Sequence, residues 1–130
     1  DSLPSRGLGD VYKRQLIINL RQDPQFGAAL VLGSGGVLVE LLDDSATLLL
    51  PTSLAEIIRA LKSLRVGRLL EGFRGRPAVD ITKVAEEIHK LCMAYQEQVK
   101  TITEIEINPL FVYQEKVSAI DALIQVPADK

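Results

Sequence analysis

The 130-residue sequence predicts an α+β fold, with a mostly antiparallel sheet and two main helices packed on one of its faces. Short apolar runs of strand length are joined by turn-forming residues. Two amphipathic helical patterns lie among these runs, without the regular strand-helix alternation of a parallel sheet. With 47% hydrophobic residues, a chain of this length can bury one core, so we expect one domain or subdomain.

The first fifteen residues differ from the rest of the chain. They mix glycine, proline, serine and charges without any period, and the string DVYKRQ resembles translated adaptor sequence. We therefore expect a non-native scar or a disordered segment over residues 1–15, the folded subdomain over 16–126 and a tail over 127–130.

Four apolar runs in the first half of the chain predict short strands: Leu16–Leu20, Ala28–Leu32, Val37–Leu42 and Ala46–Leu50. Gln22-Asp23-Pro24 predicts a turn after the first run, because proline cannot donate to a strand ladder. Gly33-Ser34-Gly35-Gly36 predicts a tight hairpin between the second and third runs.

Two helices are expected after these strands. Ser53 and Glu56 form a capping box at the start of the first, whose apolar residues recur at helical spacing: Leu54, Ile57, Ile58, Leu61 and Leu64. Glycines and a proline predict a loop from Arg65 to Val79, with at most one helical turn near Leu69-Leu70. Asp80 can cap the second helix, whose apolar face comprises Ile81, Val84, Ala85, Ile88, Leu91, Cys92, Tyr95 and Val99.

The last two predicted strands bring polar residues together. A four-residue loop over Tyr113–Lys116 pairs Val112 with Val117, Leu110 with Ala119, and Asn108 with Asp121. Alternation places Glu106 and Asn108 on one face and Ile105 and Ile107 on the other. The same alternation puts Asp121 in an apolar row with Leu110, Val112, Val117, Ala119 and Leu123.

An acid in an apolar row needs a partner. Mg²⁺ suits it, because this ion takes one or two protein oxygens, keeps waters and uses substrate phosphates for its other positions. The alternative is that Asp121 pairs with a lysine or arginine and that Asn108-Pro109 simply ends a strand.

Composition excludes several classes of function. A formal charge of −2 lacks the basic excess typical of nucleic-acid binding, and no apolar run is long enough for a membrane span, so we expect a cytoplasmic chain without either partner. The single cysteine, Cys92, rules out an intrachain disulfide. His89 lies within the second helix without a nucleophile or acid at catalytic spacing, so we exclude it from the site.

Three segments resemble the C-terminal part of the ATP-grasp domain in ADP-forming acetyl-CoA and acyl-CoA synthetases and in succinyl-CoA synthetase beta chains. They are the D-P-Q-F-G segment from Asp23 with the later G-S-G-G and Glu40, the Arg74-Gly75-Arg76-Pro77 segment with Asp80, and the E-I-N-P-L segment from Glu106 with Asp121-Ala122. Ala28 departs from the family, which often has proline there.

The resemblance implies a ligase that converts an acid, ATP and CoA to acyl-CoA, ADP and phosphate, with a phosphohistidine borne on a CoA-binding domain or subunit. In the family the matching Asn and Asp coordinate Mg²⁺, which implies metal-binding roles for Asn108 and Asp121, with Glu106 as a weaker candidate contact to the nucleotide. The half of the domain that would hold the adenine is absent from this sequence, so we expect the isolated chain to be inactive.

Two further groups are candidate contacts to phosphate. Gly35 and Gly36 could offer backbone amides, although a plain hairpin turn is the alternative. Arg74 lies among glycines that permit close approach of the backbone to a ligand, within a locally basic stretch that could equally be a solvated face. The alternative for the whole chain is a non-catalytic ligase-like module that regulates a protein acetyltransferase, or a small partner-binding domain.

Overall fold

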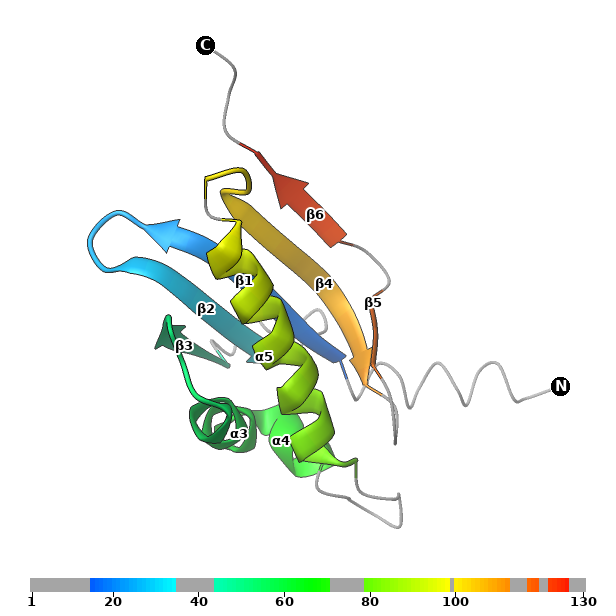
Figure 1. The fold of residues 1–130 in the computed structure, drawn as a ribbon. Coiled ribbons are helices and arrows are strands. Elements are labelled where there is room, and N and C mark those ends of the chain that lie inside the picture. The colour runs from blue at the N-terminus through cyan, green and yellow to red at the C-terminus, as the bar shows by residue number, and fades with distance from the viewer. Residues whose placement is uncertain are drawn as a thin grey trace, which may run out of the picture.

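The computed structural model describes residues 15–34, 44–70, 79–98, 100–112, 117–119 and 122–126. The described elements are β1 (Gln15–Asp23), β2 (Gly27–Ser34), β3 (Ser45–Leu49), α3 (Leu54–Ser63), α4 (Arg65–Leu70), α5 (Ile81–Glu97), β4 (Glu104–Val112), β5 (Val117–Ala119) and β6 (Ala122–Gln125). Figure 1 shows their arrangement.

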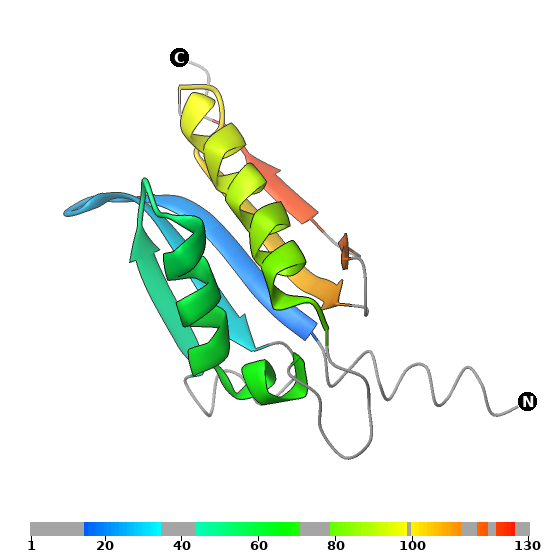
Figure 2. The ribbon, with the colours of Figure 1, turned by 60° about the horizontal axis from the view of Figure 1, so that its bottom comes forward.

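The strands form one sheet in the order β3-β2-β1-β4-β5, and β6 also pairs with β4. Every described pairing is antiparallel. Strand β1 occupies one edge of β4. The two short strands β5 and β6 therefore follow each other along the opposite edge of β4. Helices α3 and α5 lie on the same side of the sheet (Figures 1 and 2), which confirms the predicted α+β architecture.

The core lies between the sheet and these helices. Fully buried side chains of β1 and β2 face it, as do the apolar faces of α3 and α5; its members include Leu16, Ile18, Leu20, Leu30, Leu32, Ile57, Leu61, Ile88 and Tyr95. The opposite face of the sheet carries no helix among the described residues. We call this the free face of the sheet, and the candidate site lies on it.

The turn from β1 to β2 confirms the break predicted at Asp23-Pro24. The Asp23 carboxylate accepts hydrogen bonds from the backbone amides of Gln25 and Phe26, at 2.8 and 2.9 Å. The hydrogen bond from the Phe26 amide has the larger effect on the pKa of Asp23. Together with the bond from the Gln25 amide, it holds this pKa below its usual value. Gly27 follows with φ of 88°, a left-handed conformation that suits glycine.

The predicted hairpin around Gly33–Gly36 is wrong in its choice of partner strand. Strand β2 pairs with β1 on one edge and with β3 on the other, from Ala29 opposite Leu49 to Gly33 opposite Ser45. Both edges are therefore occupied, and Ala46–Leu50 rather than Val37–Leu42 supplies the neighbour. Residues 35–43 themselves lie outside the described part.

Helix α3 begins as predicted. The Ser53 hydroxyl accepts from the Glu56 amide at 3.1 Å, and the Glu56 carboxylate accepts from the Ser53 amide at 2.9 Å. The prediction for the following loop is wrong at its start, because α4 spans six residues from Arg65. Its first amide donates to the Asp44 carboxylate at 2.9 Å, a cap supplied from 21 residues upstream.

Helix α5 also follows its predicted pattern. The Asp80 side chain accepts from the Lys83 amide, and the predicted apolar face is buried except for half-buried Leu91 and for Val99, which lies outside the described residues. No helix in the described part of the chain is long and apolar enough to cross a membrane.

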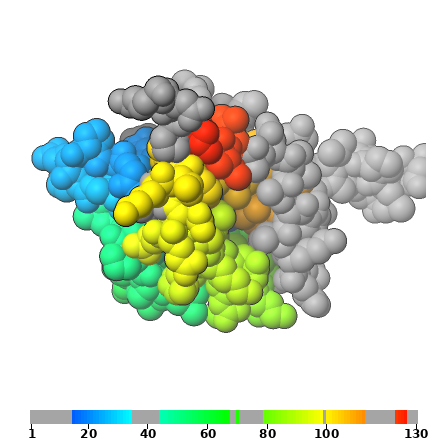
Figure 3. All heavy atoms as spheres, turned by 45° about the horizontal axis from the view of Figure 1, so that its top comes forward, coloured from blue at the N-terminus to red at the C-terminus, as the bar shows by residue number. Residues whose placement is uncertain are grey.

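The outer strand β6 and the residue that follows it expose apolar side chains. Leu123, Ile124 and Val126 are each more than half exposed. Figure 3 shows β6 in red at the surface, beside the yellow C-terminal end of α5.

Candidate functional site

Strand β4 contains a β-bulge at Asn108 and Pro109. Leu16 lies opposite Leu110, but Ile18 lies opposite Ile107. Two residues of β4 therefore stand where β1 has one, and the peptide bond between them is cis. Bulges of this kind change the direction of side chains and recur beside active sites.

The bulge changes which residues of β4 face the helices. Ile105 and Ile107 are buried before it, and Leu110 and Val112 after it. The predicted face shared by Glu106 and Asn108, away from the two isoleucines, is thus confirmed, and Asn108 is exposed. The predicted apolar row is wrong, because strict alternation through Asn108-Pro109 ignores the extra residue and puts Leu110 and Val112 on the wrong face.

The pairing of β4 with the outer strands follows the predicted register. Val112 lies opposite Val117 and Leu110 opposite Ala119. Beyond the bulge the same register resumes, with Ile107 opposite Ala122. Two residues separate the two pairings on each strand. Asp121 lies outside the described residues, so its pairing with Asn108 stays a prediction.

A polar cluster occupies the free face of the sheet beside the bulge. Asn19 of β1 lies opposite Glu106, and its Nδ2 donates to Glu104 Oε2 at 2.7 Å. The Oδ1 atom of Asn19 is buried and receives no hydrogen bond from any donor in the described part of the chain. Asn19 is not among the residues predicted for the site, although a lone amide within the apolar run Leu16–Leu20 was a signal.

The donor set on this face fits a hard divalent cation. Glu106 and Asn108 present carboxylate and amide oxygens, the ligand atoms that Mg²⁺ prefers. The buried, unpaired acceptor Oδ1 belongs to Asn19, which lies opposite Glu106 on β1. Among the described residues there is no group of three or more His, Cys, Asp or Glu side chains able to hold a metal. An ion here would therefore combine few described protein oxygens with oxygens from a ligand.

The remaining predicted site residues are not placed. Gly35, Gly36 and Arg74 all lie outside the described residues. The two positions that flank residues 35–43 are described: the Ser34 hydroxyl donates to the Asp44 carboxylate and accepts from the Val66 amide at 3.2 Å. Both flanking residues are therefore tied to the start of α4.

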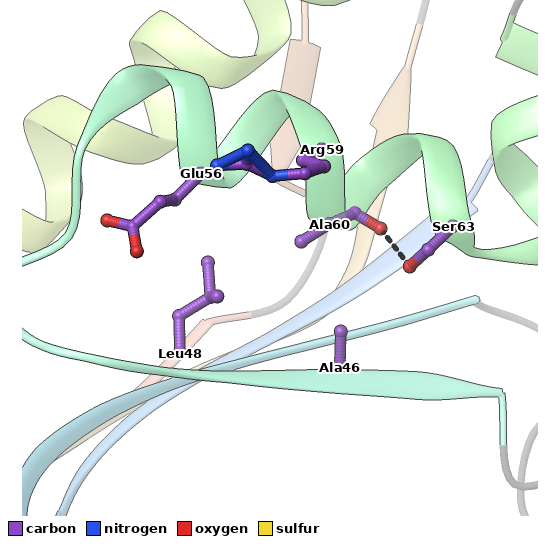
Figure 4. A pocket seen from close by; sticks show the side chains of 6 residues that line it. All are labelled: Ala46, Leu48, Glu56, Arg59, Ala60 and Ser63. Atoms are coloured by element: carbon purple, nitrogen blue, oxygen red, sulfur yellow. Dashed lines mark hydrogen bonds between the residues drawn. The ribbon is translucent and has the colours of Figure 1, made fainter.

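Two hollows lie away from this cluster. One, of about 310 Å³, is formed between β3 and α3 by Ala46, Leu48, Glu56, Arg59, Ala60 and Ser63 (Figure 4). A second is lined by Lys62, Ser63, Leu64 and Arg65. The first lies on the helix side of the sheet, and the Glu56 carboxylate there is already bonded to the α3 cap. Half-buried His89 belongs to α5 in the same helical layer, outside the cluster.

An antiparallel sheet covered by helices on one side, with oxygen-bearing side chains on the other, defines an α+β subdomain with a candidate ligand site on its free face. The model of the ATP-grasp domain family matches residues 8–126. The chain therefore belongs to the ATP-grasp domain family.

Comparison with curated proteins shows which members of the ATP-grasp family the chain resembles. The chain is 34% identical over 109 residues to the beta subunit of acetate–CoA ligase (ADP-forming) I from Pyrococcus furiosus, covering 84% of this chain and 47% of the relative. It is 37% identical over 105 residues to the acetate–CoA ligase (ADP-forming) of Methanocaldococcus jannaschii, covering 78% and 14%. The chain thus spans about half the length of the matched beta subunit and a smaller share of the longer relative.

The chain is also similar to solved structures of this class of enzyme. The acetyl-coenzyme A synthetase 1 of Candidatus Korarchaeum cryptofilum, in complex with coenzyme A and Mg-AMPPCP, superposes with a TM-score of 0.79 at 34% identity, covering 87% of this chain and 53% of that one. In that structure a phosphohistidine segment points towards the nucleotide binding site. These similarities confirm the predicted resemblance to the C-terminal part of the ATP-grasp domain of ADP-forming acyl-CoA synthetases.

Proposed function

We propose that this chain is the Mg²⁺- and nucleotide-binding part of an ADP-forming acyl-CoA synthetase. The intact enzyme would convert an acid, ATP and CoA to acyl-CoA, ADP and phosphate. Matched relatives include ADP-forming ligases for acetate and for 4-hydroxybutyrate, which supports the ligase class without fixing the acid.

The β4 bulge is the observation that carries the proposal. It keeps Ile107 and Leu110 in the core while leaving Asn108 exposed on the free face. Leu110 pairs with Ala119 and Ile107 with Ala122, and continuing this register across the gap would put Asp121 opposite Asn108, which supports the proposal. We assign the metal to Asn108 and Asp121 on this basis and on the family resemblance.

The other candidate residues would contact the nucleotide. Glu106 shares the face with Asn108, and Gly35, Gly36 and Arg74 are proposed from the sequence alone. A bound Mg²⁺ would neutralise charge on the transferring phosphoryl group and align it. The chain's own residues would hold the metal-nucleotide complex against the sheet and orient it, which is most of what phosphoryl transfer requires from a protein.

The remaining parts of the enzyme are proposals as well. Because the chain spans about half of the related beta subunit, we expect a preceding half with the adenine pocket and a CoA-binding domain or subunit with a phosphorylatable histidine. That enzyme would work in the cytoplasm, where ATP and CoA are supplied. This chain alone is expected to be inactive.

Substitution in the intact synthetase tests the assignment. Asn108→Ala and Asp121→Ala are each expected to lower ATP-dependent acyl-CoA formation on the order of 100-fold, because each removes a charge-stabilising contact to the reacting complex. Lys90→Ala, at an exposed position on α5, is the control and should keep full activity. Full activity of the Asp121 variant at saturating Mg²⁺ would refute the role.

A further inference from the structure

Asn19 occupies an unusual place for an amide side chain. It lies in the middle of β1, the central strand, with Val31 of β2 on one side and Glu106 of β4 on the other. Its strand neighbours Ile18 and Leu20 are fully buried against the helices. Alternation therefore puts Asn19 on the free face, in line with Glu106.

The donor atom of Asn19 is already committed. Nδ2 donates to Glu104 Oε2 at 2.7 Å, diagonally across the two strands. Glu104 and Glu106 are two residues apart on one face of β4, so their charges repel. A hydrogen bond that fixes the Glu104 carboxylate against β1 keeps it from moving over Glu106.

The acceptor atom of Asn19 is free. Oδ1 is buried and has no donor among the described residues. Rotating the amide by half a turn would bring Oδ1 onto the Glu104 carboxylate, an acceptor facing an acceptor, so the Glu104 bond determines the orientation. Buried acceptors are rarely left without a donor, so a bound ligand that supplies one would be favoured here.

We propose that Asn19 is a positioning residue for the Mg²⁺-nucleotide complex. Its Nδ2 braces Glu104, and its Oδ1 accepts a hydrogen bond from a water carried by the metal, because Mg²⁺ keeps several waters when it binds through few protein oxygens. This inference rests on the proposed function. It adds β1 to the site and gives the two glutamates different roles. Glu104 is held by the hydrogen bond from Asn19, whereas Glu106 remains available to the ligand.

Calorimetric binding of AMPPCP to the intact synthetase tests the proposal, with Mg²⁺ and separately with the metal removed by EDTA. Asn19→Ala is expected to weaken Mg-AMPPCP binding about tenfold, as expected for losing hydrogen bonds to charged groups. Binding without metal should not change. Thr47→Ala is the matched control and should bind like wild type, because Thr47 is an exposed polar residue on β3, which is separated from β1 by β2.

A double-mutant cycle tests whether Asn19 acts through Glu104. The Asn19→Ala and Glu104→Ala losses should not add, because each breaks the same bond. Asn19→Leu keeps the branched shape and the number of side-chain heavy atoms without the polar groups, and it gives the same test if the alanine variant does not fold.

Unchanged Mg-AMPPCP affinity, or an equal loss with and without metal, would overturn the proposal, since an equal loss indicates only a structural role. The Asn108→Ala variant separates this failure from that of the proposed function. If Asn108→Ala abolishes metal-dependent binding and Asn19→Ala leaves the Mg-AMPPCP affinity unchanged, the inference fails alone. If Asn108→Ala has no effect either, the proposed function fails as well.

Discussion

Through one hydroxyl group, Tyr95 joins α5 to β1 and to the residue that precedes β4. Its ring is fully buried on α5, its Oη donates to the Thr103 carbonyl at 2.8 Å, and it accepts from Gln22 Nε2 at 3.4 Å. Burial raises the pKa of Tyr95, an effect that the Gln22 bond opposes, so the hydroxyl stays protonated and able to donate at neutral pH. The bond fixes the approach to β4, the strand that carries Glu106 and Asn108.

Removing this hydroxyl is expected to destabilise the fold. Tyr95→Phe keeps the ring and leaves the Thr103 carbonyl without its donor, which should lower the free energy of unfolding by about 1–2 kcal/mol. Urea denaturation followed by circular dichroism measures the change. Met93→Leu, at a half-exposed position on the same helix, should be close to neutral. Equal stability of Tyr95→Phe and wild type would show that the bond contributes nothing.

At the scale of elements, the contact of α3 with α4 depends on a missing side chain. A Cβ atom on Gly67 would lie 2.5 Å from the Leu61 carbonyl oxygen and 3.1 Å from the Lys62 Cα. Both are backbone atoms, so they cannot rotate away as a side chain would. Glycine is therefore required for α4 to fold back directly after α3.

Gly67→Ala should push α4 away from the C-terminal end of α3. We expect the free energy of unfolding to fall by about 1–3 kcal/mol, the usual cost of overpacking. Thermal denaturation checks this, with Lys62→Ala at an exposed position of α3 as the control. A Gly67→Ala variant as stable as wild type would mean that α4 adjusts without strain.

Local signals predicted the elements whose ends are set locally. The capping box at Ser53, the cap at Asp80 and the turn at Asp23 are all made by residues within three positions of the groups they bind. The β4–β5 register followed from the length of the connecting loop. These features need no knowledge of the rest of the chain.

Features that depend on distant residues could not be predicted in this way. Helix α4 starts where Asp44 caps it, β3 rather than Val37–Leu42 takes the edge of β2, and Asn19 finds Glu104 from 85 positions away. The bulge at Asn108-Pro109 becomes visible only when β4 is aligned with β1. For the site, the sequence placed Glu106 and Asn108 on the correct face but missed the bulge that separates Asn108 from Leu110.

At the scale of the whole molecule, burial between sheet and helices also protects the one cysteine. Cys92 is 2% exposed, and desolvation raises the pKa of its thiol to about 11. The thiolate is the reactive form, so very little of it exists at neutral pH in the folded state.

Labelling kinetics test this packing. At pH 8 we expect the folded protein to react with a thiol reagent on the order of 100-fold more slowly than the urea-unfolded chain, whose thiol has an ordinary pKa of about 8.5. The rate should rise as the pH approaches the raised pKa. Equally fast labelling of folded and unfolded protein at pH 8 would show that Cys92 is not enclosed.

In the described part of the chain, helices cover the sheet on one side only, and the candidate ligand residues Glu106 and Asn108 lie on the other side. The most direct test of their role is a crystal structure of the intact synthetase with Mg²⁺ and AMPPCP. We predict one ion bound by both Asn108 Oδ1 and an Asp121 carboxylate oxygen, at about 2.0–2.1 Å. An ion held without either residue, or an Asn108 and Asp121 too far apart to share it, would contradict the account.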